Sequence, residues 1–313
     1  MSSSQRGHDR GDNHNRNDNH DRDSNHDRGK PCHYYTVRHY VAWGVNGWGQ
    51  GILLVLFAFF CFAYPFAVIG VAFDVRPPFS LDWAGSALLF LEGLLLIVAT
   101  GLRYGWLRGL VAGVSVIVLS YCVEALGVGT GFPFGIYRYT NVLLPRLPGG
   151  VPMAVMFAWV LVVLGAYGCL RVGKRRLGVF GALLGAALAT LLDLEIEPVA
   201  FHIESYWEWL GPGHLNYYGV PIANFVAWFV VAFVLLLLVD TILFRFFRPS
   251  TNASFASRLT TLMPRLLFST SLFMFGLVDL THGYYGATLL GILAGLVVVG
   301  LAFIKKEKIY ANT

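Results

Sequence analysis

Charged residues are scarce in this sequence. Lys, Arg, Asp and Glu together make up 13% of the 313 residues, whereas soluble domains contain about 25%. Twelve of the charged side chains, six of each sign, lie in residues 1–30, so the rest of the chain is poorer still. This composition excludes an ordinary water-soluble globule. The net charge of +5 does not indicate a nucleic-acid partner, because DNA-binding proteins concentrate basic residues on an exposed face.

The sequence also lacks the motifs of several enzyme classes. The histidines after residue 30 form no HxxHH cluster of the kind that membrane di-iron oxygenases need. No GxxxxGK[ST] motif occurs, and the glycines at 127, 129 and 131 lack a βαβ context. The four cysteines imply no disulfide framework, because Cys61, Cys122 and Cys169 lie in apolar runs and Cys32 stands alone. We therefore predict no cofactor and no metal site.

The N-terminal segment has nothing to bury. Residues 2–30 contain no aliphatic or aromatic side chain, and histidines recur there every six positions at His8, His14, His20 and His26. Such a composition predicts a disordered tail. We favour a solvated repeat over a weak metal-binding tract, and the segment lacks the build of a signal peptide. The predicted domains are this polar tail over residues 1–40 and an integral membrane helical domain over residues 41–313.

The body of the chain consists of apolar runs, each close to the ~20 residues that cross a bilayer. These runs predict an all-α fold, a polytopic transmembrane helix bundle of about eight spans. The fifth run is rich in Gly and Ala, which suits close packing between helices. We place the spans at residues 51–73, 84–101, 107–126, 151–170, 177–193, 221–243, 262–280 and 284–304.

Basic residues sort to one side of these eight spans. Fourteen Lys and Arg residues fall on the side that holds both termini, and three fall on the other side, namely Arg76, Arg138 and Arg146. Because positive residues gather on the cytoplasmic side, we predict a multi-pass protein of the cell membrane, with the lipid bilayer as a partner and both termini in the cytoplasm.

Acidic residues sort to the opposite, outer side. Glu124 lies in the last turn of the third span and Asp193 closes the fifth. An ionisable group within a span is costly and commonly functional, so we favour functional roles over structural carboxylates at the headgroup level. Asp193 and Glu197 share a helix face that excludes Glu195, and Pro198 is predicted to end this helix.

The outer connections are too apolar to be solvated linkers. Residues 127–150 and 193–221 mix Gly, Pro and aromatic residues with isolated charges, which predicts interfacial or re-entrant segments that fold back onto the bundle. Asn224 and Trp228 share a face at the start of the sixth span and are predicted to point toward the same outer pocket.

Other polar groups have two interpretations each. Tyr137, Arg138 and Tyr139 are suited to holding a carboxylate, but such residues also anchor at the interface. For Trp207 and Trp209 we slightly favour the interfacial role.

Three more acidic residues are open to a structural role. Asp279, close to His282 in a short turn, is equally consistent with function and structure. Glu92 is either a structural partner or a proton donor, and Asp240, near Arg245, is interpreted as an interface ion pair.

Three segments together resemble a known family. They read EALGVGTGFPFGIYRYT (124–140), GVPMAVMFAWVLV (150–162) and DLEIEPVAFHIESYWEWLGPGHLNYYGVPIANFVAW (193–228). These segments resemble the carotenoid biosynthesis membrane-protein family, which includes acyclic-carotenoid hydratases of the bacterioruberin type. The resemblance covers about residues 50–304 and leaves the polar tail outside.

The resemblance implies hydration of the terminal isopropylidene double bond of an acyclic carotenoid. Protonation by a carboxylic acid would give a tertiary carbocation, which water would capture. Glu124 or Asp193 would donate the proton and the other would position the water. Tyr137 and Tyr139 would line the pocket, Arg138 would tune a carboxylate and Asn224 would hold the water. The expected substrate-binding residues, some of them stabilising the cation, are Tyr139, Trp159, Trp207, Trp228, Asp279 and His282.

Three other functions remain open from the sequence. A cyclase would trap the same carbocation with an internal alkene. A lipid or small-solute transporter is disfavoured, because the polar residues gather at one leaflet rather than at the midplane. The third is a scaffold for other membrane enzymes of the carotenoid pathway, with the tail as a docking arm.

Overall fold

The computed structural model describes residues 33–75, 78–79, 81, 83–171, 176–211, 213–244 and 255–310. The chain divides into two units, residues 1–43 and 44–313. In the first unit, residues 33–43 are helical and form the start of α1. The predicted tail repeat and Cys32 lie outside the described residues, as do Arg76, Asp82, Lys174, Arg175, Arg245 and Arg248.

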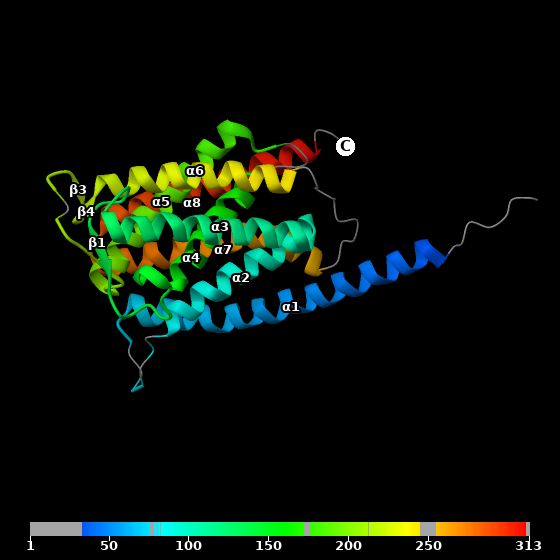
Figure 1. The fold of residues 1–313 in the computed structure, drawn as a ribbon, viewed down its shortest axis with the longest axis horizontal. Coiled ribbons are helices and arrows are strands. Elements are labelled where there is room, and N and C mark those ends of the chain that lie inside the picture. Colours follow the sequence, from blue (N-terminus) through cyan, green and yellow to red (C-terminus); the bar gives the residue numbers. More distant parts are fainter. Residues whose placement is uncertain are drawn as a thin grey trace, which may run out of the picture. The chain divides into compact units, whose positions relative to one another are not determined.

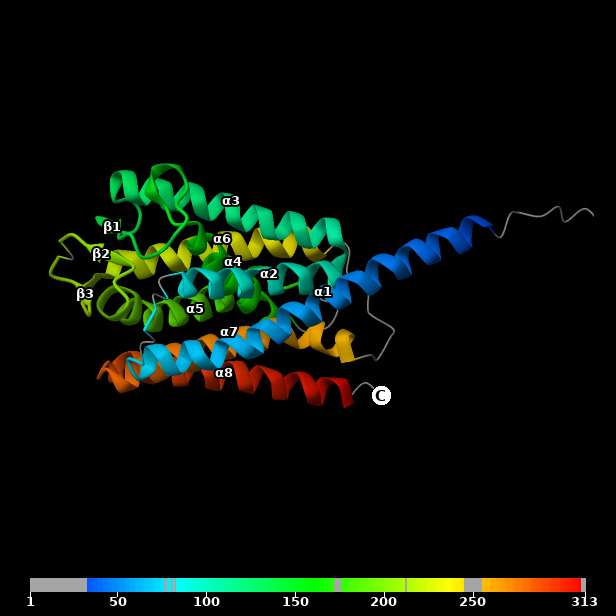
Figure 2. The same ribbon diagram turned by 90° about the horizontal axis from the view of Figure 1, so that it is seen from below.

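Helices dominate the second unit, and the predicted all-α class is confirmed. In Figures 1 and 2, α2 to α8 lie side by side as a bundle. Seven helices in the described part of the chain are long and apolar enough to cross a membrane, while the apolar stretch of α8 covers Tyr285–Leu301. The helices are α1 (His33–Ala72), α2 (Ala84–Tyr104), α3 (Trp106–Thr130), α4 (Met153–Leu170), α5 (Gly178–Pro198), α6 (Ile222–Phe244), α7 (Phe255–Thr281) and α8 (Tyr285–Tyr310).

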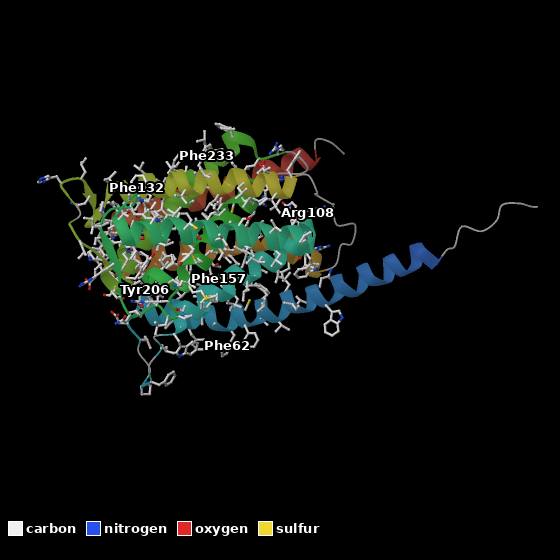
Figure 3. All side chains as sticks on the ribbon, viewed as in Figure 1. Phe62, Arg108, Phe132, Phe157, Tyr206 and Phe233 are labelled. Carbon is white, nitrogen blue, oxygen red and sulfur yellow. The ribbon has the colours of Figure 1, made fainter. Side chains whose placement is uncertain are left out.

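The centre of the bundle is α4, most of whose side chains are buried within the protein. In contrast, Phe62 of α1 is 70% exposed and points away from the neighbouring helices (Figure 3), as a side chain facing lipid does. Small residues bring the backbones close together, as the Gly- and Ala-rich fifth run predicts. A Cβ atom at Gly185 of α5 would lie 2.7 Å from Leu236 of α6, so only glycine fits there without a shift.

At one end of the bundle, the carboxylate of Asp240 on α6 contacts several polar groups. Its side chain is 1% exposed and pairs with Arg171 at 3.4 Å and with Arg176 at 3.4 Å. The backbone N–H of Leu177 donates to Oδ1 at 3.0 Å and that of Gly178 to Oδ2 at 3.4 Å. Asp240 thus forms an ion pair, as predicted, but with Arg171 and Arg176; Arg245 lies outside the described residues. These contacts fix the start of α5.

The two long connections that were predicted to lie on the outer side pair with each other at the opposite end of the bundle (Figure 1). Strand β1 (Tyr137–Tyr139) runs antiparallel to β2 (Trp207–Trp209), while β3 (Asn216–Tyr217) pairs with β4 (Val220–Pro221). Figure 3 shows Tyr206, from the loop before β2, at this end and Arg108 of α3 at the other. The prediction that these connections fold back onto the bundle is confirmed, because Tyr137 and Tyr139 hydrogen-bond to Glu124 of α3.

The fifth helix extends beyond the predicted membrane span, which ended at residue 193. The α-helix continues to Pro198, as predicted, and the chain then makes a π-helical turn over Val199–Ile203. Proline lacks the N–H that donates within a helix, and the wider turn that follows carries the chain toward β2. Glu197 consequently lies within the bundle, one turn beyond Asp193.

Candidate active site

Glu124 is held by three hydrogen-bond donors from two sides. Its side chain is 4% exposed, near the end of α3. The hydroxyls of Tyr137 and Tyr139 donate to Oε2 at 2.6 and 2.8 Å. The indole N–H of Trp159, on the central helix α4, donates to Oε1 at 2.9 Å. A buried carboxylate needs such donors to offset its lost hydration, and here strand β1 and helix α4 supply them.

Glu197 has a second, separate set of three donors. The indole N–H groups of Trp207 and Trp209 donate to Oε2 at 3.0 and 3.2 Å. The amide of Asn224 donates to Oε1 at 2.9 Å, and it also donates to Oδ2 of Asp193 at 3.2 Å. The predicted shared face of Asp193 and Glu197 is thus confirmed, and one residue of α6 joins the two carboxyl groups.

The alternation of side chains along β1 decides which of its residues face the cavity. Successive strand residues point to opposite faces, so Tyr137 and Tyr139 face Glu124 while Arg138 points outward. Arg138 is 66% exposed at its side chain and pairs with the exposed Glu208 of β2 at 2.6 Å. The structure therefore does not bring Arg138 to the buried carboxylates. Among the described residues, Arg138 makes no contact through which it would tune a buried carboxylate, the role that the sequence had suggested.

A small cavity lies between these groups. Its volume is about 30 Å³, which is room for about two water molecules. Glu124 and Glu197 contribute to its wall, whereas Asp193 and Trp159 stand behind the wall. The other lining residues are Phe134, Tyr137, Tyr139, Val155, Trp207, Trp209, Asn224 and Trp228.

Aromatic rings surround the carboxyl groups. Trp159 and Trp228 stack with centroids 3.7 Å apart and planes 9° from parallel. Tyr137 lies 5.1 Å from the Trp209 ring, and Tyr139 packs edge-on against Trp207 at 6.0 Å. Burial, followed by the charge of Glu124, raises the pKa of both tyrosines. Both phenols therefore remain neutral donors at any ordinary pH.

Two predicted substrate-binding residues lie on another side of α5. Asp279 is fully buried on α7 and interacts electrostatically with Glu195, which is not in contact with this cavity. The Nδ1 atom of His282 contacts the backbone oxygen of Val278 at 2.9 Å, and its Nε2 atom lies 3.6 Å from Asp74. The remaining predicted residues of the site, apart from Arg138, are brought together.

Four residues that line the cavity were absent from the predicted set: the apolar Phe134 and Val155, and Glu197 and Trp209, which carry polar groups. The helical spacing from Asp193 and the WEW sequence of β2 were the available signals. Among the described residues, no group of three or more His, Cys, Asp or Glu side chains is arranged to hold a metal ion. The chemistry of the site therefore rests on carboxyl, phenol, indole and amide groups.

Fold and site together define a class: a membrane-embedded helical bundle with an acidic, aromatic-lined cavity beneath a two-stranded cap. Residues 84–298 match the family described as carotenoid biosynthesis protein, and the chain belongs to this family. The resemblance seen in the sequence is thereby confirmed.

Part of the chain is similar in sequence to a protein with a described activity. The protein is 35% identical over 135 residues to the bisanhydrobacterioruberin hydratase of Haloarcula japonica. The alignment covers 41% of this chain and 45% of that relative, so less than half the length of either protein is compared. No solved structure matches this chain.

Proposed function

We propose that this protein is a carotenoid hydratase, which adds water across the terminal isopropylidene double bond of an acyclic carotenoid. The observation that carries the proposal is the cavity itself, because two carboxyl groups line a space of about 30 Å³ that suits water. The described relative is a hydratase, and the family supports a carotenoid substrate.

The proposed reaction begins with proton transfer from a carboxylic acid to the terminal alkene. The alkene π electrons form the new C–H bond and leave a tertiary carbocation. A water molecule in the cavity then forms the C–O bond, and its extra proton passes to the second carboxylate. A return of this proton to the first carboxyl group, through cavity water, restores the protein. The reaction consumes one water and no net proton.

The hydrogen-bond donors favour Glu124 as the acid. Its Oε2 atom faces two phenol hydroxyls, and a hydroxyl can rotate to accept a hydrogen bond instead of donating one. A protonated Glu124 therefore still finds a partner. Glu197 faces two indole N–H groups and an amide N–H, none of which can accept. This set holds Glu197 as a carboxylate, ready to receive the proton of the attacking water.

Asp193 takes a supporting position in this scheme instead of the expected acid or base role. It lies behind Asn224, whose amide gives one N–H to Asp193 and the other to Glu197. This arrangement fixes the amide orientation and, through it, the position of the Glu197 carboxylate. The faces of Trp207, Trp209 and Trp228 line the cavity, where their π electrons stabilise a carbocation without reacting with it.

We also propose an orientation of the helix bundle in the membrane. Basic residues gather at the Asp240 end, which we place in the cytoplasm together with both termini. The cavity then lies at the level of the outer leaflet of the cell membrane, where it can reach the end group of a bilayer-spanning polyene. Other membrane enzymes of the pathway are the expected partners, since substrate and product are both insoluble in water.

Product mass tests this function directly. The protein is expressed in a host that makes an acyclic carotenoid, and the pigment is expected to gain the mass of one water at each modified end. Glu124→Gln is expected to abolish the gain, and Glu208→Gln, a control at an exposed carboxylate, to retain it. An isomer of unchanged mass would instead indicate a cyclase, and unchanged pigment at normal expression would exclude both enzymes.

A further inference from the structure

A second pair of acidic side chains lies on the other face of α5. Glu195 points toward α7 and α8, where its Oε1 atom lies 2.9 Å from the position of a Cβ atom at Gly276. A Cβ atom at Gly291 of α8 would overlap the same carboxyl group. Asp279 follows Gly276 by three residues on α7 and thus shares its face. Glycine at both positions leaves room for the Glu195 side chain between the helices.

Neither carboxyl group has a partner among the described residues. Glu195 and Asp279 are both 0% exposed, and all four of their carboxyl oxygens lack a hydrogen bond. No described Lys, Arg or His side chain forms an ion pair with either residue. This pair differs from the first site, where each of the two glutamates receives three N–H or O–H groups.

A third oxygen is directed at the same place. The hydroxyl of Tyr217, from strand β3, is buried and also has no hydrogen-bond partner. It interacts electrostatically with both Asp279 and Glu195. Tyr284, in the turn between α7 and α8, also interacts electrostatically with Asp279. Within the described part of the chain, the surroundings of the pair therefore offer oxygen atoms from three elements and no positive charge.

Two neighbouring carboxyl groups without donors cannot both remain charged in a dry interior. The cost of burying unpaired carboxylates is several kcal/mol per ion, and the described residues supply no cation to offset it. A proton or a bound cation would provide the positive charge. Oxygen-only ligands of this kind suit a proton shared between carboxyl groups or an alkali cation, while two acidic groups are few for a divalent ion.

We propose that Glu195 and Asp279 form a second site, which binds one monovalent cation, either a shared proton or Na⁺, between α5, α7 and α8. The Tyr217 oxygen completes the site from β3. This site is separate from the hydratase cavity, since Glu195 and Asp279 lie outside the cavity wall. Occupancy would tie α7 and α8 to the helix that carries Asp193 and Glu197.

Thermal unfolding of the full chain in detergent tests the site. The wild type, the double variant Glu195→Gln/Asp279→Asn and the control Glu208→Gln are compared from about pH 6 to pH 9, in NaCl and in choline chloride of equal ionic strength. Loss of the bound charge should lower the midpoint of the wild type as the pH rises in choline chloride. If Na⁺ is the ligand, NaCl restores the midpoint by about 2–4 °C. If a proton is the ligand, the midpoint falls equally in both salts.

In the double variant, Na⁺ should not move the midpoint, and the fall of the midpoint with rising pH should be smaller than in the wild type, because the cavity carboxyl groups still titrate. The control should behave as the wild type does. A double variant with the pH and salt dependence of the wild type would overturn the proposal. Should the double variant fail to fold, the wild type still decides, because a midpoint insensitive to both pH and Na⁺ excludes a bound cation. These measurements need no carotenoid, so their outcome is distinguishable from failure of the hydratase proposal.

Discussion

Replacing each cavity glutamate by glutamine should separate the two donor sets. At Glu124, the new amide faces two hydroxyls that can rotate to accept, and the hydroxyl hydrogens can then turn toward each other or toward water in the cavity that both tyrosines line, so no polar group loses its partner. At Glu197, the new NH₂ group faces either the two indole N–H groups or the Asn224 amide. Rotation of the Asn224 amide relieves the second clash but removes the donor from Asp193. Glu197→Gln therefore leaves one buried polar group unsatisfied.

The expected change in the unfolding midpoint follows from the number of unsatisfied buried polar groups. One buried unsatisfied group costs about 1–3 kcal/mol, and each kcal/mol lowers the unfolding midpoint of a chain this long by about 2 °C. We expect Glu197→Gln to unfold about 2–6 °C below the wild type and Glu124→Gln to unfold close to it. Both variants should lose hydration by about 10²–10⁴-fold, the usual contribution of a general acid or base.

The assay is thermal unfolding of purified protein in detergent, combined with product mass in the pigment-making host. Glu208→Gln serves as the matched control, because Glu208 is an exposed carboxylate on the same strand pair. The reasoning fails if Glu124→Gln is the less stable variant, or if both variants match the wild type in midpoint.

Three further perturbations test the surroundings of the cavity. Trp159→Phe keeps an aromatic ring for stacking but loses the N–H that donates to Glu124. Glu124 becomes charged when it gives up its proton, and loss of a hydrogen bond to a charged group costs about 1.5–3 kcal/mol, so turnover should fall about tenfold or more. Trp159→Leu should be worse, and equal effects would refute a role for the stack. Arg138→Glu or Glu208→Arg should reduce turnover by a few fold at most, because exposed ion pairs contribute about 1 kcal/mol or less. The double variant, with the two charges exchanged, should recover the turnover. Failure to recover would show that the pair does not act as one unit. Burial raises the pKa of Tyr137 and Tyr139, so their phenols stay protonated to higher pH than free tyrosine. The pH–rate profile should therefore show no phenol titration below about pH 10. An alkaline decline in rate that disappears in Tyr139→Phe would contradict this prediction.

The helices could be predicted from the sequence because burial in lipid requires long apolar runs. The eight predicted spans all fall on observed helices, and the face shared by Asp193 and Glu197 followed from helical spacing alone. The opposite orientation of Glu195 followed from the same spacing. These features depend on local geometry, which a sequence carries directly.

The cap over the cavity could not be predicted in this way. Strands β1 and β2 are three residues each and lie about 70 residues apart in the sequence, so neither has a periodic pattern of useful length. Without that pairing, Tyr137, Arg138 and Tyr139 looked like one group, although strand alternation sends Arg138 outward. The π-helical turn after Pro198 likewise had no sequence signal, and it carries β2 and its two tryptophans toward Glu197.

The fifth helix, α5, packs against α6 through a face of small residues, yet the two helices adopt one defined alignment. Its glycines and alanines let it lie close to α6, but a smooth stripe of small residues permits sliding and rotation as readily as close approach. Polar contacts at its two ends remove that freedom. Asp240 binds the first backbone N–H groups, and Asn224 engages Asp193 and Glu197 near the last turn. Both anchors lie on α6, so the two helices form a matched pair that fits at a single rotation and a single height.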